Sequence, residues 1–238
     1  SIADINADGF LDIYVSNSGD IKGDNKQNEL YINNGDLTFT EMAADYGLDD
    51  TGYSTHAAFF DYDRDGDLDC YLLNNSYKGG FRITNIGTNQ RPIRDSVGGD
   101  KLFRNDDGYF NDVSEESGIY GSVIGFGLGV TVGDVNNDGW MDIYVSNDFF
   151  ERDYLYINNA DGTFSEELEY QIKSISAASM GADMADINND GYSEIFVTDM
   201  LPEPDERIKT VTTFDNWDRH QYINCLLYTS DAADEGHC

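Results

Sequence analysis

Four short acidic segments of the chain have the residue types and the spacing of cation-binding loops. Each has Asp at positions 1 and 5, Asp or Asn at position 3, Gly at position 6, and Asp or Glu at position 9. The segments begin at Asp4, Asp61, Asp134 and Asp186. Calcium is a hard cation that takes about six to eight oxygen ligands, and a sharp turn at the glycine would bring these side chains around one ion. The pattern therefore predicts up to four Ca²⁺ sites.

The predicted ligands are the side chains at positions 1, 3, 5 and 9 and the backbone carbonyl at position 7. The side-chain ligands are Asp4, Asn6, Asp8, Asp12, Asp61, Asp63, Asp65, Asp69, Asp134, Asn136, Asp138, Asp142, Asp186, Asn188, Asp190 and Glu194. The carbonyl ligands are those of Phe10, Asp67, Trp140 and Tyr192. The alternative is that these segments are ordinary solvated Asp-Gly turns. Four segments with the same residue types at the same positions make that a poor explanation. Magnesium is disfavoured because it demands a small octahedral site.

Charge repulsion also favours a bound cation. Two carboxylates about 5 Å apart repel by roughly 3 kcal/mol at an effective dielectric of about 20. The second segment would place Asp61, Asp63, Asp65 and Asp69 around one centre. Such a group of carboxylates is hard to hold together without a cation.

The sequence around the acidic segments has strand character, which argues against EF-hand loops. An EF-hand has Glu at position 12 and a following helix. Position 12 is instead Val15, Leu72, Val145 and Val197. Short β-branched or aromatic runs follow each loop at 13–15, 71–73, 143–145 and 195–197. Further strands are predicted at 30–32, 102–103 and 155–157, around Phe39, Phe110 and Phe164, and before the loops at 56–60, 128–132 and 182–185.

These strands define a repeat of four antiparallel strands, with the acidic loop between strands 1 and 2. We predict an all-β fold, a partial β-propeller of about four blades from a probable seven, of which two are complete. The expected blades are 1–55, 56–125, 126–178 and 179–224, the first without its strand 1 and the last without its outer strands. A solenoid would need shorter and more uniform repeats. Residues 225–238 resemble translated adapter read-through from a sequencing library, and we expect them to be a non-native tail.

The loops, the stretch Phe126-Gly-Leu-Gly129 and the Asn-Asn-Gly-Asp turn resemble the FG-GAP/VCBS repeats of integrin α-subunit propellers over about residues 1–200. Segments 179–191 and 196–202 are similar to the cartilage acidic protein group, whose bacterial members often carry an ASPIC/UnbV domain. The resemblance implies a seven-bladed propeller with calcium on one face, in a secreted or cell-surface protein, with a bacterial outer envelope favoured. It does not imply a catalytic activity.

Charge excludes some classes of partner. The chain has 46 Asp and Glu against 14 Lys and Arg, a formal net charge of -32, so nucleic acid and anionic lipid are poor partners. No apolar run approaches membrane-spanning length. The 3 cysteines have no spacing typical of a disulfide framework or zinc site, and Cys70 is expected to be a buried thiol.

A partner is expected at the end opposite the acidic loops. In a meander the connections between strands 2 and 3 lie there, and they span 17–29, 74–100, 147–153 and 198–222. Long variable loops on a rigid scaffold are the usual place for recognition. The expected contacts to a protein or glycan are Tyr77, Lys78, Phe81, Arg82, Arg91, Arg94, Phe149, Phe150 and Arg152. The alternative is that the basic residues only offset local acidity.

The leading functional hypothesis is a non-enzymatic recognition or adhesion module stiffened by calcium. A polysaccharide lyase or glycosidase would need acid and base groups clustered at the central mouth, whereas the carboxylates here have metal-ligand spacing and only 3 histidines are present. A structural spacer in a multidomain envelope protein is the third possibility.

Overall fold

A computed structural model describes residues 1–19, 26–76, 89–148, 151–176 and 178–199. It contains three antiparallel sheets of four strands, each in sequence order, and a fourth sheet of two strands. The first sheet consists of β1 (Ile2–Ala3), β2 (Asp12–Val15), β3 (Glu29–Asn33) and β4 (Phe39–Glu41). The second consists of β5 (Ser54–Phe60), β6 (Asp69–Asn74), β7 (Lys101–Asp106) and β8 (Tyr109–Asp112). The third sheet consists of β9 (Gly127–Gly133), β10 (Asp142–Asn147), β11 (Tyr154–Asn158) and β12 (Phe164–Glu166). The fourth consists of β13 (Ser179–Ala185) and β14 (Glu194–Asp199).

The predicted all-β class and the strand positions are confirmed, because every predicted strand lies within or overlaps an observed one. The prediction that the first repeat lacks its strand 1 is wrong. Two residues are enough to form it, since Ile2 pairs with Ile13 and Ala3 pairs with Asp12. Three sheets therefore have four strands, where two were expected.

Two short helices were not predicted. They are α1 (Ala43–Tyr46) and α2 (Leu168–Gln171), and each follows the outermost strand of its sheet. Among the described residues, no helix has the length and apolar character needed to cross a bilayer.

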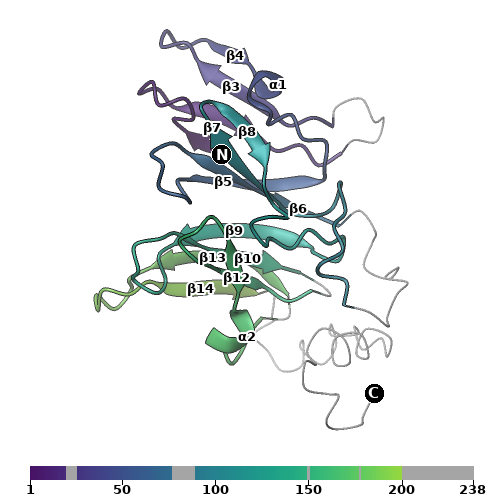
Figure 1. The fold of residues 1–238 in the computed structure, drawn as a ribbon, viewed down its shortest axis with the longest axis vertical. Helices are drawn as coiled ribbons and strands as arrows, with labels where there is room; N and C mark the ends of the chain where they lie inside the picture. The colour runs from purple at the N-terminus through teal and green to yellow at the C-terminus, as the bar shows by residue number, and fades with distance from the viewer. Residues whose placement is uncertain (20–25, 77–88, 149–150, 177, 200–238) are drawn as a thin grey trace, which may run out of the picture.

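The sheets are stacked one after another along the molecule, as Figure 1 shows. A separate cluster of buried apolar side chains fills each junction: Tyr14 and Leu30 face Leu72 between the first two sheets. Tyr71 and Leu73 face Ile143 and Val145 at the second junction. The core is thus divided among the sheet-to-sheet interfaces, which is the packing expected of consecutive propeller blades.

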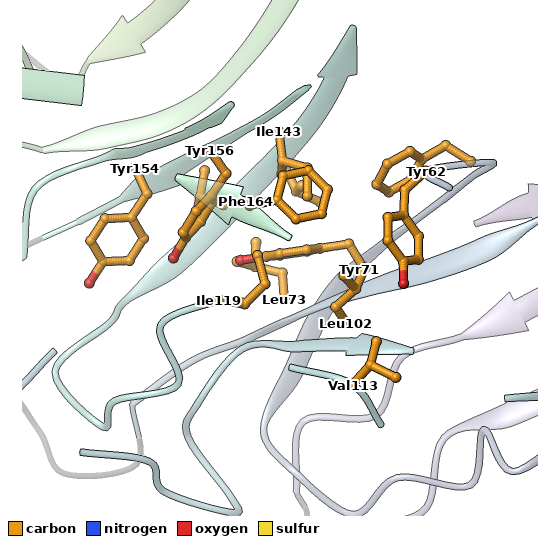
Figure 2. Close-up of a cluster of buried hydrophobic side chains, with 13 residues drawn as sticks. Tyr62, Tyr71, Leu73, Leu102, Val113, Ile119, Ile143, Tyr154, Tyr156 and Phe164 are labelled. Carbon is orange, nitrogen blue, oxygen red and sulfur yellow. The ribbon is translucent and has the colours of Figure 1, made fainter. Parts of the chain in front are cut away.

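The central strand of each inner sheet contributes to two junctions at once. All residues of β6 are buried, and successive side chains point to opposite faces. Cys70 and Leu72 pack toward the first sheet, while Tyr71 and Leu73 pack toward the third. Figure 2 shows this second junction, with Tyr71 and Leu73 close to Ile143 and Tyr156. The burial of Cys70 confirms its expected environment.

Small residues allow the innermost strands to approach closely. A Cβ atom on Gly127 of β9 would lie 2.4 Å from Leu73 Cδ1, a distance that side chains do not tolerate. Thr55 Oγ1 of β5 donates to the Gly127 carbonyl at 3.0 Å. Glycine is therefore required where the second and third sheets meet near their inner edges.

Candidate metal centre

The four acidic loops share one backbone conformation. We name them loop 1 (4–12), loop 2 (61–69), loop 3 (134–142) and loop 4 (186–194). Position 4 has a positive φ in every loop: 56° at Ala7, 64° at Arg64, 59° at Asn137 and 60° at Asn189. The glycine at position 6 has φ between 88° and 103°, which only glycine adopts at low cost. The repeated loop pattern in the sequence thus specifies a repeated structure.

The acidic residue at position 9 is a brace as well as a predicted ligand. In loop 3, Asp142 is fully buried and accepts from two backbone N–H groups, Val135 at 3.0 Å and Asn158 at 2.9 Å. Asp12 and Asp69 make the equivalent pairs of bonds. Burial raises the pKa of Asp69 to about 7, and it also raises the pKa of Asp142. In loops 1, 2 and 3, position 9 therefore ties its loop to the third strand of the sheet.

In loops 1, 3 and 4 the side chains largely satisfy one another. Asn6 Nδ2 donates to Asp8 Oδ2 at 3.0 Å, and the matching Asn-to-Asp distances are 2.8 Å in loop 3 and 3.0 Å in loop 4. The position 1 carboxylate accepts from the N–H groups of positions 5 and 6, as Asp4 does at 3.0 and 2.9 Å. In loop 4, Glu194 accepts from the Ile187 N–H and the Asn188 amide.

Loop 2 is different because Asp63 replaces the asparagine and has no amide to donate. Carboxylate oxygens of Asp61, Asp63 and Asp65 lie within 4.8 Å of one another, the one such acidic cluster found among the described residues. Asp61 Oδ1 and Asp67 Oδ1 are buried without a hydrogen-bond partner. Burial and the neighbouring Asp65 charge raise the pKa of Asp67 to about 6 and also raise that of Asp63. This concentration of unsatisfied carboxylate oxygens fits a divalent cation.

Neighbouring loops contact each other directly. The guanidinium of Arg64, at position 4 of loop 2, lies 5.0 Å from the centre of the Trp140 ring in loop 3. Asn137, at position 4 of loop 3, donates to the Gly191 carbonyl of loop 4 at 2.7 Å. Position 4 of loops 2 and 3 thus contacts position 7 or 6 of the following loop, which links loops 2, 3 and 4.

A family model described as "FG-GAP-like repeat" matches residues 4–72, 93–145 and 134–197. These matches cover more than half of the chain, and each contains at least one acidic loop. The chain belongs to the FG-GAP-like repeat family. The repeated sheets and loops described above are its FG-GAP-like repeats, as the sequence resemblance predicted.

Each similar protein matches part of this chain, and the match covers less than half of that protein's own length. Integrin alpha-3 of Mus musculus is 30% identical over 99 residues, which is 36% of this chain and 9% of the relative. Integrin alpha-3 of Cricetulus griseus has the same identity and coverage. A solved Agrocybe aegerita structure, reported for specific recognition of non-reducing terminal N-acetylglucosamine, has a TM-score of 0.45 at 19% identity and covers 83% of this chain and 46% of that chain.

At the opposite end of the FG-GAP-like repeats, two of the arginines predicted to contact a partner are inside the protein. Arg91 is 6% exposed and donates from Nε and Nη2 to Glu151 Oε1 at 3.0 and 2.9 Å. Arg152 is 4% exposed and pairs with Glu166 and Glu169. Both guanidinium groups are paired with carboxylates of this chain, so contact of either one with a partner stays a prediction.

Arg94 is half-buried and donates to the carbonyls of Ile119 and Asp100 at 2.9 and 3.0 Å. It therefore joins the connection before β7 to the connection between the second and third sheets. The other predicted partner residues, Tyr77, Lys78, Phe81, Arg82, Phe149 and Phe150, lie outside the described residues. The same holds for residues 200–224 of the fourth expected blade and for the 225–238 tail.

A second repeated brace, which the sequence analysis missed, lies at this end. Asp100 precedes β7 and accepts from the Asn74 N–H at 2.9 Å and the Tyr71 hydroxyl at 3.0 Å. Asp153 does the same with Asn147 and Tyr144. The first sheet has Asn28 at this position, where it accepts from the Asn17 N–H and donates to the Tyr14 hydroxyl. The signal was available as an Asp or Asn immediately before each third strand, paired with a Tyr two residues after position 9.

We predict that Asp100→Asn weakens the pH dependence of folding stability. Burial raises the pKa of Asp100 to about 7. A carboxyl whose pKa is higher in the folded state stabilises the fold below its unfolded pKa of about 4, and that contribution is lost as the pH rises through about 7. Asn28 shows that asparagine fits this position. Relative to the parent, Asp100→Asn should gain about 2–4 kcal/mol between pH 5 and pH 8, measured by urea unfolding in excess chelator. Parallel pH profiles for the two proteins would contradict the prediction.

Proposed function

We propose that the chain is part of a calcium-stabilised, non-enzymatic recognition module of a secreted or cell-surface protein. The FG-GAP-like repeats and the similarity to part of integrin alpha-3 support an integrin-like recognition role. The chain spans only 9% of the length of that relative, so the activity and partners of the whole protein are part of the proposal. A calcium affinity of about 10⁻⁴ to 10⁻³ M would suit an extracellular module.

The observation that carries the proposal is the geometry of loop 2. Three carboxylates converge there, and two carboxylate oxygens of the loop are buried without a partner. Calcium would be held by Asp61, Asp63 and Asp65, and it would neutralise their charge and stiffen the turn between β5 and β6. The corresponding side chains of loops 1, 3 and 4 offer further oxygen donors to the same kind of ion.

Recognition is proposed for the end opposite the loops, with a protein or glycan as the partner. The arginines described there position the connections instead of offering free charge: Arg91 and Arg152 bind carboxylates, and Arg94 binds carbonyls. Ile93, which is 53% exposed, lies on the same connection and offers apolar contact area. A rigid base of buried ion pairs would support a binding surface formed by the outer atoms of these connections.

A thermal melt with calcium and with chelator tests the proposed role of calcium. A ligand present at about 100 times its Kd stabilises the folded state by about 2.7 kcal/mol per site. For a chain of this size that gain corresponds to a rise in Tm of about 5–10 °C. At 10 mM CaCl₂ relative to EGTA we expect this rise for a Kd of about 10⁻⁴ M, and about half of it for a Kd of about 10⁻³ M. Magnesium at the same concentration should give a smaller rise.

The calcium-dependent rise in Tm can be assigned to the acidic loops only if it depends on their carboxylates. Asp61→Asn should reduce the calcium-dependent rise in Tm, because it removes charge from the cluster of loop 2. A melting curve of the parent protein that is unchanged by calcium would overturn the proposed role of calcium.

A further inference from the structure

A buried carboxyl group joins the third sheet to the fourth. Ser179, the first residue of β13, donates from Oγ to Asp153 Oδ2 at 2.6 Å. The same carboxyl accepts from the Tyr144 hydroxyl at 2.6 Å and from the Asn147 N–H at 2.8 Å. Asp153 and Ser179 are both fully buried. Asp153 therefore holds two sheets together, in addition to bracing the connection before β11.

The first junction has the same arrangement with an amide in place of the carboxyl. Asn28 donates from Nδ2 to the Tyr14 hydroxyl and to the hydroxyl of Ser54, the first residue of β5, both at 2.9 Å. Ser54 in turn donates to Asn74 Oδ1 at 2.9 Å. This link contains no carboxyl, so none of its groups titrates between about pH 4 and pH 9.

The second junction has no such link, although it has the carboxyl. Gly127 of β9 lies opposite Asn147 in the strand pairing, as Ser54 lies opposite Asn74 in the preceding sheet. Glycine has no hydroxyl, so Asp100 receives no hydrogen bond from this position. Of the three junctions that the structure describes, the third alone joins its sheets through a carboxyl at this position.

The surroundings of Asp153 make its ionisation costly. Burial raises the pKa of Asp153, and its hydrogen bonds and the charge of Arg152 oppose this rise only in part. Arg152 is already paired with two other carboxylates. The titratable groups of the surrounding elements are Tyr144 in β10, Glu151 and Arg152 in the same connection, Glu166 in β12, Glu169 in α2, Asp183 in β13 and Asp199 in β14.

The fourth sheet is where the loss of one contact should have a large effect. Apolar side chains of the third sheet, among them Tyr144 and Leu155, pack against partly buried side chains of β13 and β14. Ser179 is the one fully buried residue of these two strands. Segments with few buried contacts open locally at a small free-energy cost. The bond from Ser179 to Asp153 is therefore an important part of what keeps this junction closed.

We propose that the contact between Asp153 and Ser179 is a pH-sensitive link, which holds the fourth sheet on the third at acidic pH and weakens as the pH rises. A carboxyl whose pKa is raised on closing stabilises the closed form below its open-state pKa of about 4, and that contribution is lost as the pH rises through the closed-state pKa. The inference goes beyond the proposed function. It does not depend on calcium, because neither residue belongs to an acidic loop.

Hydrogen–deuterium exchange of the full-length chain in EGTA, between pH 5 and pH 8, tests the proposal. Rates are corrected for the intrinsic pH dependence of amide exchange, and peptides from 179–199 are compared with peptides from the first sheet. In the parent, the ratio of open to closed forms of β13 and β14 should increase with pH, by up to about tenfold per pH unit between the two pKa values. Asp153→Asn should remove this increase, because Asn28 shows that an amide can make the equivalent contacts.

Three further variants make the test specific to this link. Asn28→Asp should give β1–β4 the pH dependence that the parent shows in β13 and β14. Asp183→Asn removes an exposed carboxyl from β13 and should leave the parent's pH dependence unchanged. Ser179→Ala should speed exchange of β13 and β14 at every pH while retaining its increase with pH, because Asp153 stays buried.

Two results would overturn the proposal. One is an undiminished pH dependence of β13 and β14 in Asp153→Asn. The other, which decides the question if Asp153→Asn does not fold, is an unchanged exchange profile of β1–β4 in Asn28→Asp. Asp100 is present in every variant, so its own titration contributes equally to all of them and does not affect the comparison.

Discussion

Replacement of Arg91 by Met should lower the free energy of unfolding by about 3–5 kcal/mol, the cost expected when one partner of a buried ion pair is removed. The side chains of Arg91 and Glu151 are 8% and 0% exposed, and they join the connection before β7 to the connection before β11. Glu151 Oε2 already has no partner. Without Arg91 the carboxylate would remain buried with less compensation, and the junction between the second and third sheets would open more easily.

The free energy of unfolding lost by Arg91→Met should be smaller at acidic pH than at basic pH. Burial raises the pKa of Glu151, although the charges of Arg91 and Arg152 oppose this rise. Removing Arg91 takes away the larger opposing charge, so the pKa should rise further. A carboxyl whose pKa is raised on folding stabilises the fold at low pH and loses that contribution as the pH rises through the folded pKa. Urea unfolding of Arg91→Met at several pH values measures this dependence directly.

Two controls separate the buried pair from a general loss of charge. Arg91→Met combined with Glu151→Gln should recover a large part of the stability, because the uncompensated charge is gone. Arg104→Met breaks a pair with Asp106 whose side chains are 37% and 44% exposed, and it should cost no more than about 1 kcal/mol. A similar loss for Arg91→Met and Arg104→Met would show that the burial of the first pair contributes nothing.

Periodic sequence features gave correct predictions because each repeat contains the same local signals. The turn at Gly66 follows from local backbone chemistry, and the β-branched and aromatic runs after each loop fix the strands. The sheet order followed as well, because consecutive strands of each repeat are antiparallel neighbours, as a meander requires. The short strand β1 was missed because two residues carry no detectable period, and its pairing with Ile13 is decided by tertiary contact.

The charged residues outside the loops were interpreted less well, because sequence position does not reveal burial. Arg91 and Glu151 are 60 residues apart, and only the stacking of two sheets brings them together. Asp100 and its equivalents Asp153 and Asn28 follow connections of different lengths, so this repeated position was not recognised in the sequence, although their Tyr and Asn partners recur at fixed distances from the loops. A charged residue in a variable connection was therefore assigned to the surface, where such residues are usually found.

Asp142→Ala should be destabilising even in the absence of calcium, by about 3–5 kcal/mol. The substitution leaves the Val135 and Asn158 N–H groups without their carboxylate acceptor, and each unsatisfied buried donor costs about 1–3 kcal/mol. Asp138→Ala in the same loop removes only bonds of exposed groups and should cost about 1 kcal/mol or less in EGTA.

Comparing the stability of Asp142→Ala and Asp138→Ala in chelator shows whether position 9 acts as a structural brace or only as a calcium ligand. If position 9 acted only by binding the ion, then both variants would be nearly as stable as the parent in EGTA and would differ from it only in calcium. If the buried carboxylate holds the loop against β11, as the bonds of Asp142 indicate, then Asp142→Ala loses stability under both conditions. Since the loop must be held in shape before an ion arrives, the brace would also lower the entropic cost of closing the ligands around calcium. Asp142→Ala should therefore lose calcium affinity in loop 3 through disorder of the loop, in addition to the loss of any direct ligand bond.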